Sequence, residues 1–143
     1  MPSVTTPSDA PRVLVVDDEE SIRKFANRAL RGAGYDVGVA SDGLEALRLV
    51  AAQPRPFDLF VLDVQMPHMR GDELGRQLRQ RDPDVKVLYF TGYSDQLFAD
   101  RHTLWEHEAF IEKPVTPDGL LEAVSLLLFG HTDGPAAGGG SAV

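Results

Sequence analysis

Short runs of branched and aromatic residues recur along most of the chain, separated by segments with helical spacing. We predict five strands from these runs: Arg12–Val16, Asp36–Ala40, Phe57–Leu62, Val85–Phe90 and Ala109–Ile111. The first, third and fourth runs are almost continuously apolar. Such strands are typical of a sheet whose two faces are both covered by helices.

Apolar residues between these runs repeat at helical spacing, which predicts five helices. Gly32 and Gly34 provide a stop signal after the first helix. Asp42 can cap the second helix, and Pro54 follows its end. The apolar positions that define the helices are Ile22, Phe25, Ala29 and Leu30; Leu44, Leu47 and Val50; Leu74 and Leu78; Leu97, Phe98, Leu104 and Trp105; and Leu120, Leu121, Val124, Leu127 and Leu128.

The alternation of strands and helices predicts an α/β fold with a parallel sheet. We expect a doubly wound, flavodoxin-like sheet of five strands in the order 2-1-3-4-5, with the five helices on its two faces. A chain of 143 residues has room for one such domain, which we place at residues 11–130. Residues 1–10 are rich in proline and hydroxyl side chains, and residues 131–143 are rich in glycine and alanine, so we expect a flexible leader and a flexible tail.

The chain is acidic, with 22 Asp and Glu against 14 Lys and Arg and a formal net charge of -8. This charge disfavours direct binding to a nucleic-acid backbone. The absence of cysteine excludes disulfides, thiolate zinc sites and cysteine nucleophiles, and it is compatible with the cytoplasm. No apolar run approaches the roughly 20 residues of a membrane span, and the first residues lack the features of a signal peptide. We therefore expect a soluble, cytoplasmic protein without membrane insertion.

Polar residues that could bind a ligand or take part in a reaction follow four of the predicted strands. Asp17 and Asp18 come after the first strand and Asp63 after the third. Thr91 follows the fourth, and Lys113 comes soon after the fifth. In a sheet of this order, ligands bind at the carboxyl ends of the strands, near the switch between strands one and three. All five side chains should then converge on one crevice.

Each of these residues has an ordinary structural explanation when it is taken alone. Asp17 or Asp18 can cap the first helix, Thr91 can be a turn residue, and Lys113 can be a surface lysine. Asp63 is different because it follows a buried strand, where a carboxylate is costly to desolvate unless something pairs with it.

The combination favours a metal site and phosphoryl transfer. Three carboxylates in one place repel one another unless a cation neutralises them, and hard oxygen ligands suit Mg²⁺ or Mn²⁺. Together with the metal, the ammonium of Lys113 and the hydroxyl of Thr91 can stabilise charge on a phosphoryl group. Asp63 can then be the nucleophile that forms an aspartyl phosphate.

These residues, in this order, make the chain similar to the receiver domain of two-component response regulators, the CheY-like superfamily. The residues that carry the resemblance are Asp17-Asp18 after Val-Leu-Val-Val, the run Leu62-Asp63-Val64-Gln65-Met66-Pro67, Thr91-Gly92, and Lys113-Pro114. The resemblance covers the whole predicted domain and implies the receiver fold.

The resemblance implies a role for each residue of the metal site. Asp63 is expected to accept the phosphoryl group. Asp18 and Asp63 are expected to bind Mg²⁺ directly, and Asp17 through a water molecule. The main-chain carbonyl of Gln65 is expected to be the third protein ligand.

The resemblance also implies a switch. Thr91 is expected to hydrogen-bond a phosphoryl oxygen and Lys113 to pair with another. Phe110 matches the aromatic position whose ring changes exposure as the threonine moves, although it can equally be a core residue of the fifth strand. The Lys113-Pro114 bond is usually cis in this family. One departure is the absence of the glycine that often precedes the fifth strand, where this chain has residues 105–108 (Trp-Glu-His-Glu).

We therefore predict a stand-alone phosphoacceptor domain of a two-component or phosphorelay system. It should accept its phosphoryl group from a histidine kinase or a histidine phosphotransfer protein, switch binding to a downstream protein, and exist as a monomer or weak dimer. It should catalyse only its own phosphorylation and dephosphorylation. One alternative is a receiver that binds its partner regardless of phosphorylation. The other, an aspartyl-phosphate phosphatase or mutase, is disfavoured because those enzymes place a second acid where this chain has Gln65.

The resemblance predicts that phosphoryl lifetime depends on Tyr93, two residues beyond Thr91. The corresponding position in the family flanks the path of the attacking water, and the bulk of the tyrosine should slow hydrolysis. Loss of the aspartyl phosphate from phosphorylated protein, followed by mass spectrometry, should be faster in Tyr93→Ala. An unchanged decay rate would contradict this prediction.

Overall fold

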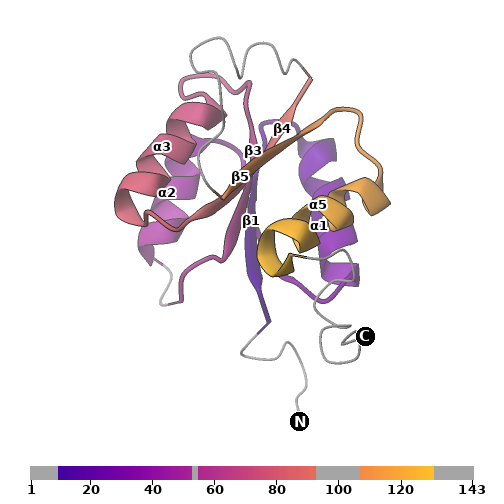
Figure 1. The fold of residues 1–143 in the computed structure, drawn as a ribbon. Helices are drawn as coiled ribbons and strands as arrows, with labels where there is room; N and C mark the ends of the chain where they lie inside the picture. Colours follow the sequence, from indigo (N-terminus) through magenta and orange to yellow (C-terminus); the bar gives the residue numbers. More distant parts are fainter. Residues whose placement is uncertain (1–9, 53–54, 93–106, 131–143) are drawn as a thin grey trace.

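The structure is a computed structural model that describes residues 10–52, 55–92 and 107–130. In this part of the chain, five parallel strands form one sheet in the order β2-β1-β3-β4-β5, which confirms the predicted topology (Figure 1). The strands are β1 (Arg12–Val16), β2 (Asp36–Ala40), β3 (Leu59–Asp63), β4 (Lys86–Thr91) and β5 (Glu108–Glu112).

Two pairs of helices cover the sheet. Helices α1 and α5 lie on one face, and α2 and α3 lie on the other (Figure 1). Their bounds are Glu20–Gly32 for α1, Gly43–Ala52 for α2, Gly71–Arg81 for α3 and Pro117–Phe129 for α5. The fourth predicted helix falls in residues 93–106, outside the described residues. Among the described helices, none has both the length and the apolar composition that crossing a bilayer requires.

Burial on both faces explains the continuous apolar runs of the central strands. Neighbouring residues in a strand point to opposite faces of the sheet. Val13 and Val15 of β1 therefore pack with α1 and α5, whereas Leu14 and Val16 pack in the cluster that α2 and α3 cover. Each face has its own hydrophobic cluster, and the sheet separates the two.

Local signals account for several helix ends. The carboxylate of Asp42 accepts a hydrogen bond from the backbone N–H of Glu45 (2.8 Å), as predicted for the start of α2. Thr116 caps α5 by accepting from the N–H of Gly119 (3.0 Å). Gly130 caps the end of α5, and its φ of 79° lies in the left-handed region that glycine adopts without strain.

Some strand bounds differ from the prediction by one or two residues. Phe57 precedes β3 although it is buried: it belongs to the hydrophobic cluster that α2 and α3 cover, and the Arg12 guanidinium lies 4.4 Å from its ring centroid. At Phe57 the apolar run therefore indicated burial, but not pairing with a neighbouring strand. At the other ends, Asp63 and Thr91 are the last residues of β3 and β4 instead of following them.

The amino end of the sheet is held by Arg12. Its side chain pairs with Asp36 of β2 (Nε to Oδ2, 3.0 Å), and its backbone N–H donates to the carboxylate of Asp58 (2.8 Å), just before β3. The N–H of Asp58 donates in turn to the carbonyl of Arg12 (2.7 Å). Arg12 thus ties β1 to both of its neighbouring strands, at the end of the sheet opposite Asp17 and Asp63.

Gly71, the first residue of α3, lies against the backbone that follows β3. Its N–H donates to the carbonyl of Val64 (2.9 Å). A Cβ at this position would lie 2.1 Å from the carbonyl oxygen of Asp63 and 3.0 Å from Cα of Val64. Since backbone atoms cannot yield as a flexible side chain can, only glycine lets α3 start this close to Asp63.

We predict that Gly71→Ala lowers the free energy of unfolding by about 2 kcal/mol or more, because the new methyl group forces the backbone at Asp63 to move. Gly32 at the end of α1 is the matched control, since nothing lies within 4 Å of a Cβ there. Gly32→Ala should raise the free energy of unfolding by about 0.5 kcal/mol. Urea denaturation measures both, and similar effects at the two sites would contradict the prediction.

Candidate functional site

Three aspartates meet at the carboxyl ends of β1 and β3. One carboxylate oxygen from each of Asp17, Asp18 and Asp63 lies within 4.8 Å of the others. Asp17 and Asp63 are buried, with 1% and 4% of their surface exposed, whereas Asp18 is exposed. The structure thus brings together the three aspartates of the five residues predicted to converge, and one of the three carboxylates is exposed to solvent.

Lys113 reaches the same place from the loop after β5. Its Nζ lies 3.3 Å from Oδ2 of Asp17 and 3.4 Å from Oδ1 of Asp63. The backbone N–H of Lys113 donates to the carbonyl of Thr91 (2.9 Å), so the lysine is anchored to the end of β4. The Lys113-Pro114 peptide bond is cis, as the resemblance predicted. One ammonium group therefore bridges two buried carboxylates.

Backbone hydrogen bonds fix Asp17 in place. Its N–H donates to the carbonyl of Ala40 (3.1 Å) at the end of β2. Its carboxylate accepts from the N–H of Glu19 (2.9 Å), and its carbonyl accepts from the guanidinium of Arg23 (2.8 Å). The suggestion that Asp17 or Asp18 caps the first helix is wrong, because the N-cap of α1 is Glu19 and no side chain caps it. Asp17 instead fixes the backbone of Glu19, while its second carboxylate oxygen faces Lys113.

The loop after β3 is fixed in a similar way. The carboxylate of Asp63 accepts from the N–H of Gln65 (3.2 Å), which holds the backbone of Gln65 beside the phosphoacceptor candidate. The N–H of Val64 donates to the carbonyl of Phe90 in β4 (3.0 Å). The side chain of Gln65 is exposed. Two hydrogen bonds therefore hold the residues that directly follow Asp63.

Burial and mutual repulsion disfavour the ionised carboxylates. Burial, followed by the charge of Asp17, raises the pKa of Asp63 to about 7, against the opposing effect of Lys113. Burial also raises the pKa of Asp17, although the hydrogen bond from Glu19 opposes it. Burial alone would lower the pKa of Lys113, but the charges of Asp17 and Asp63 outweigh it and raise that pKa. The single positive charge of Lys113 therefore does not balance the two negative charges of ionised Asp17 and Asp63.

This electrostatic imbalance fits a divalent metal ion. The three aspartates offer only carboxylate oxygens, which are the donors that hard divalent cations prefer. A cation beside them would offset the charge that Lys113 leaves unbalanced. The exposed position of Asp18 leaves room on that side for water or a phosphate oxygen.

Thr91 and Phe110 lie on the neighbouring strands. Thr91 is fully buried at the end of β4. Phe110 of β5 is paired in register with Tyr89 and is 36% exposed. The interpretation of Phe110 as a core residue is therefore wrong: on β5, Ala109 and Ile111 face the cluster under α5, and Phe110 faces the opposite side.

The structure reveals contacts that the sequence interpretation missed. Glu19 is a third carboxylate near Lys113, with its Oε1 3.7 Å from Nζ. Its only sequence signal was its place directly after Asp17 and Asp18. His107 has a φ of 70° just before β5, so a histidine adopts the left-handed conformation close to where the family often has the glycine that this chain lacks. Tyr93 lies outside the described residues.

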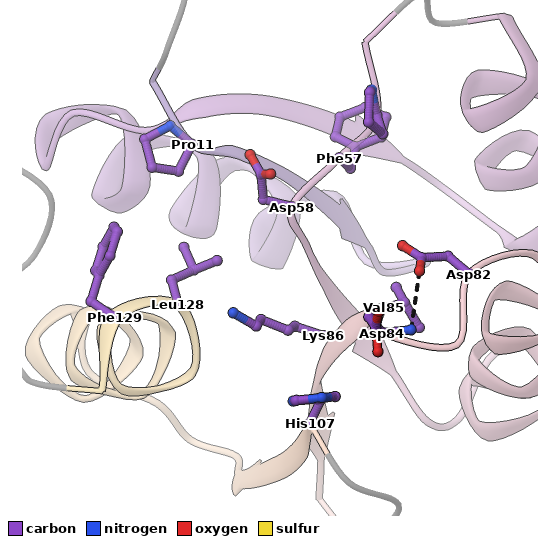
Figure 2. Close-up of a pocket in the computed structure, with 11 residues that line it drawn as sticks. Pro11, Phe57, Asp58, Asp82, Asp84, Val85, Lys86, His107, Leu128 and Phe129 are labelled. Atoms are coloured by element: carbon purple, nitrogen blue, oxygen red, sulfur yellow. Dashed lines mark hydrogen bonds between the residues drawn. The ribbon is translucent and has the colours of Figure 1, made fainter.

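A hollow at the opposite end of the sheet is separate from the aspartates. Figure 2 shows it between the start of β4 and the end of α5, with Lys86, His107 and Phe129 around it. Asp58 and Asp84 also line it. None of the five residues predicted to converge at the strand ends lines this hollow, so the predicted chemistry lies elsewhere.

Comparisons with known proteins agree with this geometry. A family model described as the response regulator receiver domain matches residues 13–125. The chain is 36% identical to the sensor kinase CckA of Brucella abortus (strain 2308) over 121 residues, which cover 85% of this chain and 13% of CckA. It is 46% identical to the response regulator MprA of Mycobacterium ulcerans (strain Agy99) over 80 residues, which cover 56% of this chain and 34% of MprA. The chain thus spans a minor part of both relatives.

A solved structure is similar over most of the chain. The response regulator protein TrrA from Thermotoga maritima, in complex with Mg(2+)-BeF, matches with a TM-score of 0.71 and 33% sequence identity. The match covers 82% of this chain and 99% of that chain.

We predict that Asp63→Asn stabilises the metal-free protein above neutral pH. A carboxyl whose pKa is 3.8 when unfolded and about 7 when folded destabilises the folded state once it ionises. The penalty is absent below about pH 4 and complete above about pH 7. After a discount for solvent screening, the variant should gain about 1–2 kcal/mol at pH 8 and almost nothing at pH 4.

Urea denaturation in EDTA at both pH values measures this difference. Asp84→Asn is the control, because Asp84 is exposed and lies outside the aspartate cluster. A gain for Asp63→Asn that is the same at pH 4 and pH 8 would show that the charge of Asp63 is not the cause.

Proposed function

Since the chain belongs to the response regulator receiver domain family, we propose that it accepts a phosphoryl group on Asp63 from a histidine kinase or a histidine phosphotransfer protein. The observation that carries the proposal is the meeting of Asp63 with Asp17, Asp18 and Lys113 at one edge of the sheet. Members of this family are typically signalling phosphoacceptors and not enzymes that act on external substrates. The kinase-containing relative CckA and the regulator MprA are consistent with such partners.

We propose Mg²⁺ as the metal, with Mn²⁺ as a substitute. Asp18, Asp63 and the main-chain carbonyl of Gln65 would hold it directly, and Asp17 through a water molecule. When bound, the cation supplies positive charge that favours the ionised carboxylates and the oxygens of the phosphoryl group. The Mg(2+)-BeF complex of TrrA supports this assignment.

In the proposed reaction, a carboxylate oxygen of Asp63 attacks the phosphorus atom as the bond from phosphorus to the donor breaks. The donor leaves with the bonding electrons, as a neutral imidazole when a phosphohistidine is the donor. Lys113 and the hydroxyl of Thr91 would each meet one phosphoryl oxygen and stabilise its charge. The rigid backbone around Asp17 and Asp63 holds these groups in place before the donor arrives.

Phosphorylation would act as a switch. Movement of Thr91 toward the phosphoryl group would change the exposure of Phe110, whose ring already lies at the surface in this structure. A downstream protein would read that change. The domain bounds 11–130, the cytoplasmic location and the monomeric or weakly dimeric state stay predictions from the sequence.

Incubation with acetyl phosphate and Mg²⁺ tests the proposal. Intact mass spectrometry should show one added phosphoryl group on the protein, lost in Asp63→Asn and in EDTA. Asp84→Asn, at an exposed aspartate outside the cluster, should be phosphorylated like the unmodified protein. No adduct would favour a receiver that binds its partner constitutively, and rapid catalytic consumption of acetyl phosphate would favour a phosphatase.

A further inference from the structure

Three carboxylates compete for the ammonium group of Lys113. Asp17 and Asp63 approach it from the buried side, at 3.3 Å and 3.4 Å. Glu19 approaches at 3.7 Å from the rim, where 62% of its side chain is exposed. Lys113 is itself only 20% exposed, so it lies between a buried pair of anions and one at the surface.

The backbone of Glu19 fixes the position from which its side chain reaches Lys113. Its carbonyl accepts the N–H groups of Ile22 and Arg23 (3.1 Å each), which starts α1, and its own N–H donates to Asp17 (2.9 Å). Its carboxylate makes no capping hydrogen bond to the helix. The start of α1 therefore fixes the backbone of Glu19, and the Glu19 carboxylate, which does not cap the helix, lies near Lys113.

Arrival of a phosphoryl group changes the other two partners of Lys113 but not Glu19. Under the proposed function, Asp63 becomes an acyl phosphate and Asp17 would help to hold the metal. Glu19 is not among the proposed metal ligands, so it keeps its full attraction for the lysine. The attraction of Glu19 therefore competes with the pairing of Lys113 and a phosphoryl oxygen.

We propose that Glu19 is a positioning residue that detains Lys113 at the rim of the site and thereby slows phosphorylation of Asp63. The inference rests on the proposed function, because it concerns the same reaction. Exposed ion pairs are weak, so the effect should be modest. In the reaction with acetyl phosphate, the bond from phosphorus to the acetyl oxygen breaks, acetate leaves, and the oxygen of Asp63 bonds to phosphorus.

The test compares two neighbouring glutamates in the full chain. Glu19→Gln should speed phosphorylation by acetyl phosphate with Mg²⁺ about two- to five-fold. Glu20→Gln is the matched control: Glu20 follows directly in sequence, but its partner is Lys24 (3.4 Å), and both side chains are largely exposed. It should leave the rate unchanged. Equal rates for Glu19→Gln and the unmodified protein would overturn the proposal.

A second background separates an action through Lys113 from simple repulsion of the donor. In Lys113→Gln, the additional Glu19→Gln change should have no effect on the rate. Where that background reacts too slowly to follow, calorimetry with Mg²⁺ and beryllofluoride, which stands in for the phosphoryl group, gives the affinity instead. Glu19→Gln should then tighten binding about two- to five-fold only when Lys113 is present.

An effect that persists without Lys113 would overturn the proposal, because Glu19 would then act on the donor directly. The proposed function fails in a different way, through the absence of any adduct on the unmodified protein. In that case the inference about Glu19 falls with it. If the unmodified protein is phosphorylated and Glu19→Gln leaves its rate unchanged, only the inference about Glu19 is refuted.

Discussion

Two buried carboxylates share one ammonium group at the carboxyl edge of the sheet, and the rest of the site depends on this shortage of positive charge. Asp17 and Asp63 are almost fully buried, and Lys113 contacts both. Burial raises the pKa of each carboxyl, so the ionised site is unstable without a further cation. A divalent metal ion can restore the balance with the charge that it brings. The same imbalance that weakens the resting fold thus prepares the site for a cation.

The fold keeps these charges together with rigid backbone. Asp17 directly follows β1 and Asp63 ends β3, and the two strands are paired, so the carboxylates cannot separate without disturbing that pairing. Gly71 lets α3 begin against the carbonyl of Asp63, and the loop between them is closed by backbone hydrogen bonds. At the opposite end of the sheet, Arg12 ties β1 to both neighbours. The central strands are therefore held at both of their ends.

Sequence reasoning succeeded where a rule links position in the chain to position in space. The apolar runs located all five strands, and the order of a doubly wound sheet correctly placed Asp17, Asp18, Asp63 and Lys113 at one edge. It failed where burial arises in another way. Phe57 was assigned to a strand because it is apolar, but it packs into the core from the segment before β3. Phe110 faces outward although its strand neighbours pack against the core.

The sequence by itself determined the class of fold, the family, and the meeting of Asp17, Asp18, Asp63 and Lys113, because strand periodicity and strand-end chemistry are local properties. Only the tertiary structure decided which of these groups touch. Lys113 and Asp17 are 96 residues apart in sequence yet 3.3 Å apart in space, and Glu19 joins them without any motif to announce it. Burial, and with it the pKa of Asp63, also follows from how β1, β3 and the loop after β5 pack together. These contacts, the burial and the pKa depend on how segments far apart in the sequence come together, which no local pattern encodes.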